Sequence, residues 1–144
     1  MHHIVYIGIG SNLGNRAKYI KDAIEHLNND QSVQVLDVSD IYETDPLDDD
    51  SGSKYMNGVL KLESKLNPFE LLRLLNGVEN KLKRVRTVKN APRTIDLDIL
   101  LYDGIVLNTK KLTIPHPKMH EREFVLKGLG QLEPSLERAF REKG

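Results

Sequence analysis

The chain predicts a single α+β domain in which an antiparallel sheet carries helices on one face. Short apolar runs rich in β-branched residues alternate with longer segments whose apolar residues recur at helical spacing. Their order along the chain is strand, helix, strand, strand, helix, strand. The 144 residues contain no internal repeat or linker, so we expect one domain over 1–144 with a core that needs no disulfides.

The first half of the chain supplies three of the expected strands and one helix. Residues 4–9 are apolar and β-branched, which is typical of a central strand. The next segment is expected to be a helix capped by Asn12 or Asn15. Its apolar residues at helical spacing are Leu13, Ala17, Ile20, Ile24 and Leu27. Alternating patterns over 33–42 and 55–66 predict the second and third strands.

The second half begins with a strong helix-start signal. Asn67 can cap the helix, Pro68 suits its first turn, and Glu70 completes a capping box. The buried stripe of this helix is expected to contain Leu71, Leu75, Val78 and Leu82. The last strand is expected over 94–101, and helical patterns follow over 120–129 and 135–141. This arrangement is the ferredoxin-like split β-α-β sandwich with extra C-terminal helices.

Composition limits the classes of function. The 21 basic and 21 acidic residues cancel, which argues against a broad nucleic-acid-binding surface. Cysteine is absent, which excludes disulfides, thiol catalysis and cysteine-ligated zinc. No apolar run approaches the roughly 18 residues that a membrane span needs, and no secretory leader is recognisable. We therefore expect a soluble, cytoplasmic protein with no membrane or nucleic-acid partner.

Asp96 and Asp98 stand one residue apart within the apolar run 95–101. Both carboxylates are expected to project from one face, because alternate side chains of a strand point the same way. The residues expected to line the core on the other face are Ile95, Leu97, Ile99 and Leu101. Two carboxylates about 6 to 7 Å apart along a strand repel each other unless a hard cation such as Mg²⁺ lies between them. The pattern predicts a metal site, and the alternative is a half-buried strand with a solvated polar face.

Residues 81–93 hold six basic residues and no acidic one. Arginine binds phosphate oxygens with a planar pair of donors, and Mg²⁺ on the aspartates would neutralise the same polyphosphate from its other side. A nucleoside triphosphate would fit between these groups. The alternative is a solvated helix end, because lysine and arginine favour the last turn of a helix. That alternative accounts for 81–84 but not for Arg86 or Arg93.

Five segments carry a resemblance to a known family. They are Gly10-Ser11-Asn12-Leu13-Gly14, Tyr42-Glu43-Thr44, Tyr55-Met56-Asn57, the run from Pro92 to Leu101, and Ile114-Pro115-His116-Pro117. In order and spacing they resemble the signatures of the 6-hydroxymethyl-7,8-dihydropterin pyrophosphokinase family, from about Ile4 to Leu129. The Pro-Arg-Thr-x-Asp-x-Asp block is the most specific part.

The resemblance implies transfer of the β,γ-diphosphate of ATP to the hydroxymethyl group of the reduced pterin, which gives AMP and the pterin diphosphate in folate biosynthesis. Asp96 and Asp98 would hold two Mg²⁺ ions that bridge the triphosphate. Arg84, Arg86 and Arg93 would bind its phosphates and stabilise charge during transfer. The implied ATP contacts are Glu79, Ile99, Lys111, Leu112, Thr113, His116 and Arg122.

The resemblance also implies a pterin site. Its residues would be Thr44, Leu47, Tyr55, Asn57 and Phe124. Aromatic rings can stack on a flat heterocycle, and an asparagine amide can match its mixed donors and acceptors. Without the resemblance, Tyr55 and Phe124 would be interpreted as core aromatics, His116 as a turn residue and Glu79 as an exposed helix residue.

The chain departs from many members of that family in two loops. Asn90-Ala91 precede Pro92 where relatives carry Trp-Gly, tryptophan is absent, and the loop is one residue shorter. We therefore expect 87–91 to close over ATP more weakly than a lid with tryptophan. Asp45 and the three aspartates at 48–50 stand where relatives often have small or apolar residues, and we interpret them as a solvated turn. The alternative is that Asp48, in place of a frequent glycine, alters a backbone contact to the pterin.

Two functions of other classes stay open. A metal-dependent nucleotide hydrolase could use the same aspartates and arginines without a pterin. A non-catalytic RNA-binding module on this fold would need spaced aromatic residues on the sheet face, and the strands around Gly8 and Asp96 offer none. We expect ATP and hydroxymethyldihydropterin as partners, Mg²⁺ as the cofactor, and a monomer.

Overall fold

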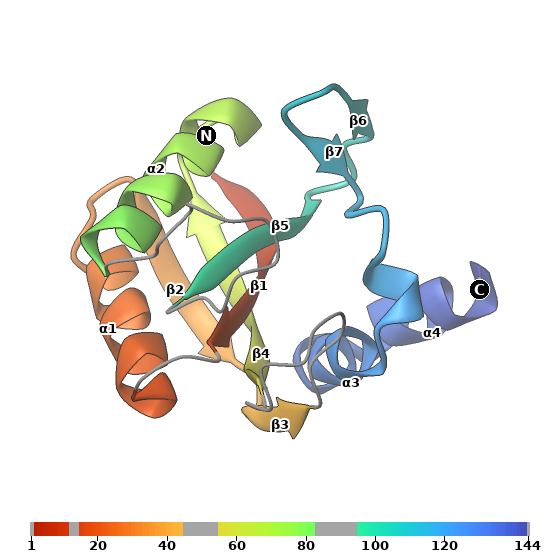
Figure 1. The fold of residues 1–144 in the computed structure, drawn as a ribbon. Helices are drawn as coiled ribbons and strands as arrows, with labels where there is room; N and C mark the ends of the chain where they lie inside the picture. The colour runs from red at the N-terminus through yellow and green to blue at the C-terminus, as the bar shows by residue number, and fades with distance from the viewer. Residues whose placement is uncertain (1, 12–14, 45–54, 83–94, 144) are drawn as a thin grey trace.

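The computed structural model describes residues 2–11, 15–44, 55–82 and 95–143 (Figure 1). In chain order its elements are β1 His3–Ser11, α1 Arg16–Asn28, β2 Val33–Val38, β3 Tyr42–Thr44, β4 Tyr55–Ser64, α2 Pro68–Lys81, β5 Asp96–Tyr102, β6 Leu107–Asn108, β7 Thr113–Ile114, the 3-10 turn η1 Met119–Glu121, α3 Glu123–Leu132 and α4 Pro134–Lys143. The main sheet has the order β2-β4-β1-β5, β3 pairs with β4, and every pairing is antiparallel. This is the ferredoxin-like order, so the predicted fold class is confirmed.

β1 is the central strand of the sheet. It pairs with β4 from His3 to Ser11 and with β5 from Val5 to Gly10. Its residues Val5, Ile7 and Ile9 are buried in a core that also contains residues of α1 and α2. A β-branched, apolar strand at this position is what the pattern over 4–9 predicts.

α1 and α2 cover the same face of the sheet, and each begins at an asparagine cap. Asn15 Oδ1 accepts from the N–H of Lys18 at 3.1 Å, which selects Asn15 as the cap of α1. In α2, Asn67 Oδ1 accepts from the Glu70 N–H at 2.8 Å, and Glu70 Oε1 accepts from the Asn67 N–H at 2.9 Å. The predicted capping box is confirmed, as is the buried stripe of Leu71, Leu75, Val78 and Leu82.

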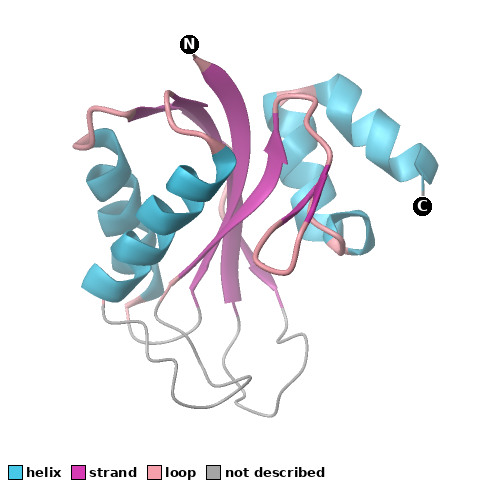
Figure 2. Cartoon of the chain, turned by 90° about the horizontal axis from the view of Figure 1, so that it is seen from above, coloured by secondary structure: helices cyan, strands magenta, loops and turns pink. Residues whose placement is uncertain are grey.

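The C-terminal helices cover the opposite face of the sheet, a position that the sequence pattern did not indicate. Figure 2 shows the sheet between the two helix layers. α3 packs so closely on β4 that a Cβ on Gly128 would lie 2.5 Å from Val59 Cγ2. The second core contains Tyr6, Val59, Leu100, Leu101, Met119, Val125 and Leu129. None of the helices within the described ranges is long and apolar enough to cross a membrane.

The segment 33–42, predicted as one strand, forms two. β2 carries an irregularity between Val35 and Asp37. After β2, the N–H of Ser39 donates to the Val59 carbonyl at 2.9 Å, and its Oγ accepts from the Val59 N–H at 2.8 Å. A side chain therefore takes over one bond of the ladder, and regular pairing resumes only at β3.

Leu101 lies on the face opposite to the one predicted. In the pairing of β1 with β5, Ile7 is opposite Ile99 but Tyr6 is opposite Leu101, so Leu100 is an extra residue. A bulge of this kind reverses the alternation of side chains beyond it. Leu101 consequently joins the core beneath α3, and Tyr102 joins the core beneath α1 and α2.

Candidate active site

Asp96 and Asp98 project from β5 on the face of the sheet that α3 covers. β1 pairs Gly10 with Asp96 and Gly8 with Asp98, and directly paired residues share a face. On the opposite face, Ile95, Leu97 and Ile99 are buried, which confirms the predicted division for these three residues. Asp96 is half-buried and Asp98 is exposed. Both carboxylates can therefore reach a ligand from solvent.

The aspartate pair is suited to a metal ion that arrives with a phosphate ligand. Among the residues that the structure describes, no three histidine, cysteine, aspartate or glutamate side chains gather into a metal-binding group. Mg²⁺ commonly takes one or two carboxylates from the protein and keeps its other positions for water and substrate phosphates. Two oxygen ligands on one strand fit that chemistry.

Gly8 and Gly10 leave β1 without side chains beside the aspartates. In the register of the sheet, Gly10 lies between Asp96 on β5 and Asn57 on β4. Because neighbouring strands are about 4.8 Å apart, the backbones of Asp96 and Asn57 are roughly 10 Å apart. A Cβ on Gly10 would lie 2.7 Å from Asn57 Oδ1. The carboxylate and the amide thus share one face, separated by bare backbone.

Asn57 is nearly buried and is oriented by a hydrogen bond. Its Nδ2 donates to Thr44 Oγ1 at 2.6 Å, and Thr44 pairs with Tyr55 across β3 and β4. Tyr55 shares a face with Asn57 because the two residues are two positions apart on one strand. Phe124, in the first turn of α3, packs against the core of that same face. Four of the five predicted pterin residues therefore lie on the side of the sheet that bears the aspartates.

A pocket of about 230 Å³ lies along the free edge of β5. It is lined by Leu72, Leu97, Asp98, Ile99, Lys110, Lys111, Leu112, Thr113, His116 and Pro117. Five of the predicted ATP contacts are in this set, together with one of the two aspartates. Glu79 and Arg122, the other two predicted contacts, do not line it.

Sequence reasoning missed four of the described residues of this lining. Leu97 was expected only as a core residue. Leu72 lies one position from the buried stripe of α2, so helical spacing gave no reason to select it. Lys110 precedes Lys111, and its charge was the available signal. Pro117 ends the segment Ile114-Pro115-His116-Pro117, and the resemblance gave it no role of its own. The proximity of α2 to this turn depends on tertiary packing.

His116 is held by backbone groups on two sides. Its N–H donates to the Leu100 carbonyl at 2.9 Å, and its Nδ1 accepts from the Lys118 N–H at 3.2 Å. A ring nitrogen that accepts carries no proton, so neutral His116 holds its proton on Nε2. Burial, and then the charges of Arg122 and Lys118, lower the pKa of His116 below its ordinary value. The ring therefore offers a neutral Nε2–H donor.

Glu79 is buried, with 3% of its surface exposed, so its interpretation as an exposed helix residue is wrong. Its Oε2 accepts from the N–H of Leu97 at 2.8 Å. Leu97 is the residue between Asp96 and Asp98. The carboxylate of Glu79 thus reaches from α2 to the strand that carries the aspartates.

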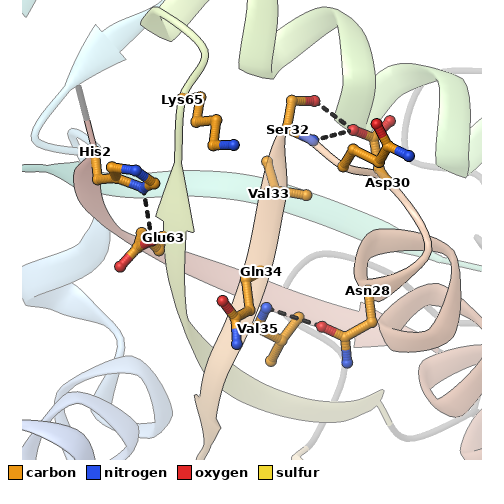
Figure 3. A pocket seen from close by; sticks show the side chains of 10 residues that line it. His2, Asn28, Asp30, Ser32, Val33, Gln34, Val35, Glu63 and Lys65 are labelled. Carbon is orange, nitrogen blue, oxygen red and sulfur yellow. Dashed lines mark hydrogen bonds and ion pairs between the residues drawn. The ribbon is translucent and has the colours of Figure 1, made fainter.

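A larger pocket, of about 580 Å³, lies beside β2 at the other edge of the sheet (Figure 3). Several of its polar groups contact one another or the backbone. His2 Nδ1 lies 2.6 Å from Glu63 Oε1, and Asn28 Oδ1 accepts from the Val35 N–H at 2.9 Å. None of the predicted site residues that the structure describes lines this pocket. Its volume alone does not make it the candidate site.

Several predicted features lie outside the described residues. They are Arg84, Arg86, Arg93 and Leu47, together with the loop 87–91, Asp45 and the acidic segment 48–50. Their roles stay predictions.

Comparison with known sequences gives a consistent family. The model of the family described as 7,8-dihydro-6-hydroxymethylpterin-pyrophosphokinase (HPPK) matches residues 6–134. The 2-amino-4-hydroxy-6-hydroxymethyldihydropteridine pyrophosphokinase of Bacillus subtilis is 43% identical over 138 residues, which cover 96% of this chain and 83% of that protein. The protein of the same name from Aquifex aeolicus is 39% identical over 92% of this chain and 81% of its own length.

Longer proteins also contain a matching region. The folic acid synthesis protein fol1 of Schizosaccharomyces pombe is 41% identical over 92% of this chain, which spans only 18% of that protein. Among solved structures, the chain is similar to Plasmodium falciparum HPPK-DHPS with pteroate, at a TM-score of 0.70 and 15% identity over 90% of this chain and 38% of that one. That structural likeness supports the fold. The family model and the bacterial relatives establish that the chain belongs to the 7,8-dihydro-6-hydroxymethylpterin-pyrophosphokinase family.

Proposed function

We propose that this chain transfers the β,γ-diphosphate of ATP to the hydroxymethyl group of 6-hydroxymethyl-7,8-dihydropterin, giving AMP and the pterin diphosphate. As a member of its family, the chain is an ATP-dependent diphosphotransferase of folate biosynthesis. One observation carries the assignment to these residues. Asp98 lines the edge pocket, while Asp96 stands in one row of the sheet with Gly10 and Asn57.

The edge pocket is proposed to hold the nucleotide. Ile99 and Leu112 offer apolar surface to a flat base, and Lys111 and His116 offer donors to phosphate or sugar oxygens. Arg122 lies at the start of α3, and its charge contributes to the lowered pKa of His116. Arg122 is therefore proposed to act near the phosphate oxygens that His116 would contact. Arg84, Arg86 and Arg93 are proposed to bind the triphosphate.

The metal and the pterin are proposed to meet at the aspartates. Two Mg²⁺ ions held by Asp96 and Asp98 would neutralise the triphosphate and polarise the phosphorus under attack. Asn57, oriented by Thr44, is proposed to hydrogen-bond to the pterin ring, and Tyr55 and Phe124 to stack on it. Leu47 is proposed to contribute to this pocket.

The proposal needs one chain, because the described residues of both substrate sites come from the same sheet and its flanking elements. We propose that the protein is a monomer and acts in the cytoplasm. Its proposed function involves neither nucleic acids nor membranes. No observation favours the hydrolase alternative, since a hydrolase would not need the oriented amide at Asn57.

The first prediction concerns the nucleotide product. When the protein is incubated with Mg-ATP, AMP should accumulate in equal amount with pterin diphosphate, and only when hydroxymethyldihydropterin is present. Chromatography of the nucleotides and pterins measures both products. Formation of ADP as the main product, or of AMP without pterin, would contradict the transferase and favour a hydrolase.

The second prediction concerns the metal ligands. Asp96→Asn and Asp98→Asn each remove an anionic oxygen while conserving volume, so turnover should fall about a hundredfold or more with folding intact. Steady-state rates at several Mg²⁺ concentrations measure the effect. Asp22→Asn is the matched control, because Asp22 lies on α1, which packs on the other face of the sheet. Unimpaired turnover of either variant at limiting Mg²⁺ would remove that residue from the site.

The third prediction concerns Gly10. A Cβ in Gly10→Ala would meet Asn57 Oδ1 at 2.7 Å and displace the amide. Pterin affinity, measured by calorimetry with a non-hydrolysable ATP analogue and Mg²⁺ present, should weaken about tenfold, as expected for losing one well-formed hydrogen bond. Gly77→Ala is the control, because a Cβ there meets no atom within 4 Å. Equal pterin affinity in the wild type and Gly10→Ala would exclude Asn57 from the pterin site.

The fourth prediction concerns His116 and pH. Because the folded state lowers the pKa of His116 from 6.5, the unfolded chain binds its proton more readily. The contribution of His116 to stability should therefore be fully present above about pH 6.5 and decrease as the pH falls below it. Urea unfolding of the metal-free protein and of His116→Gln at pH 8.0, 6.5 and 5.5 measures this contribution to the free energy of unfolding. A pH-independent difference between the two proteins would refute it.

A further inference from the structure

The free edge of β5 bears the two aspartates of the proposed site. On its inner side, this strand pairs with β1, and the pairs are Gly10 with Asp96, Ile9 with Leu97, and Gly8 with Asp98. On its outer side, no strand formed by the described residues follows β5 in the main sheet. A strand with a free edge presents backbone groups that lack a strand partner, and its outer side is less constrained than its inner side.

Glu79 occupies this outer side at the position between the aspartates. Its Oε2 accepts from the Leu97 N–H at 2.8 Å, and both residues are buried, with 3% of each exposed. A hydrogen bond between a carboxylate and a backbone N–H is stronger than one between neutral groups, and burial strengthens it further. The segment 96–98 is therefore held on both sides, by the pairing of β5 with β1 and by the bond from the Leu97 N–H to Glu79.

The position of Glu79 differs from that of the pocket residues. Leu97, Asp98 and Ile99 line the edge pocket, whereas Glu79 does not. Its carboxylate lies at the backbone of the strand, and the strand supplies the side chains that reach the pocket. This placement suits an action on the nucleotide through β5.

We propose that Glu79 is a positioning residue, whose bond to the Leu97 N–H fixes the segment of β5 that presents Asp96 and Asp98 to Mg²⁺ and the triphosphate. The inference rests on the proposed function of the aspartates. Groups that orient metal ligands without touching the metal affect metal affinity or activity by about 10- to 100-fold. Glu79 acts in this way through a backbone amide.

The first experiment measures the contact itself in the metal-free protein. Amide hydrogen exchange of Leu97 is followed by NMR in the wild type, Glu79→Gln, Glu79→Leu and Val78→Ala. Val78 is the matched control, because it is the adjacent buried residue of α2 and its truncation loosens packing without removing an acceptor. Leu97 exchange should accelerate about tenfold or more in Glu79→Leu relative to Val78→Ala, and little in Glu79→Gln, whose amide oxygen can still accept. Equal acceleration in Glu79→Leu and Val78→Ala would overturn the proposal.

The second experiment separates positioning from direct nucleotide contact. Binding of α,β-methylene-ATP is measured by calorimetry without Mg²⁺ and across a Mg²⁺ titration. Glu79→Leu should need about tenfold more Mg²⁺ for half-maximal enhancement of binding, with Mg²⁺-free affinity unchanged and with rescue in Glu79→Gln. An equal loss of affinity with and without Mg²⁺ would show a direct contact and overturn the positioning role.

The failure of the proposed function has a different signature. If the wild type itself showed no Mg²⁺ enhancement of analogue binding, and Asp98→Asn behaved in the same way, the metal site would be wrong. The Leu97 exchange rates would still decide whether Glu79 holds the strand. Wild-type enhancement that is lost in Asp98→Asn but unchanged in Glu79→Leu would reject only the role of Glu79.

Discussion

Hydrogen bonding of β1 to β4 on one side and to β5 on the other is the constraint on which the candidate site depends. These two ladders place Asn57, Gly10 and Asp96 in one row, although the three residues are far apart in the sequence. A shift of one residue in either pairing would send Asn57 or the aspartates to the opposite face, because side chains alternate along a strand. The two cores stabilise this register, since they fill both faces of the same strands.

The bulge at Leu100 divides β5 into a polar part and an apolar part. Before it, the face toward α3 carries Asp96 and Asp98. From the bulge onward, Leu100 and Leu101 both enter the core beneath α3. In a regular strand only every second residue faces α3, so Leu101 would point to the opposite face. The bulge turns Leu101 toward α3 as well, which adds apolar surface beside the carboxylates without lengthening the polar segment. A single strand can thus present ligands at one end and anchor the C-terminal layer at the other.

Within the part of the chain that the structure describes, the outer edge of β5 contacts side-chain and loop groups and no further strand of the main sheet. Glu79 accepts from the Leu97 N–H, and the N–H of His116 donates to the Leu100 carbonyl. These two contacts bring α2 and the segment after β7 to the same strand, and the edge pocket lies between them. This arrangement is consistent with a nucleotide site at a sheet edge. The backbone groups of Leu97 and Leu100 are hydrogen-bonded by a side chain and a loop, and these contacts leave space for a ligand.

The sequence by itself determined the fold class, the helix start at Asn67, the central position of β1 and the aspartate pair, because each depends on local spacing or on capping chemistry. The family resemblance added the pterin and ATP residues, and the structure places most of the described ones on two adjoining surfaces. Tertiary structure alone decided that the C-terminal helices cover the second face, that Leu101 changes sides, and that Glu79 reaches Leu97. These features arise from contacts between residues distant in the chain: a bulge is defined only by its partner strand, and a buried carboxylate only by the amide it meets.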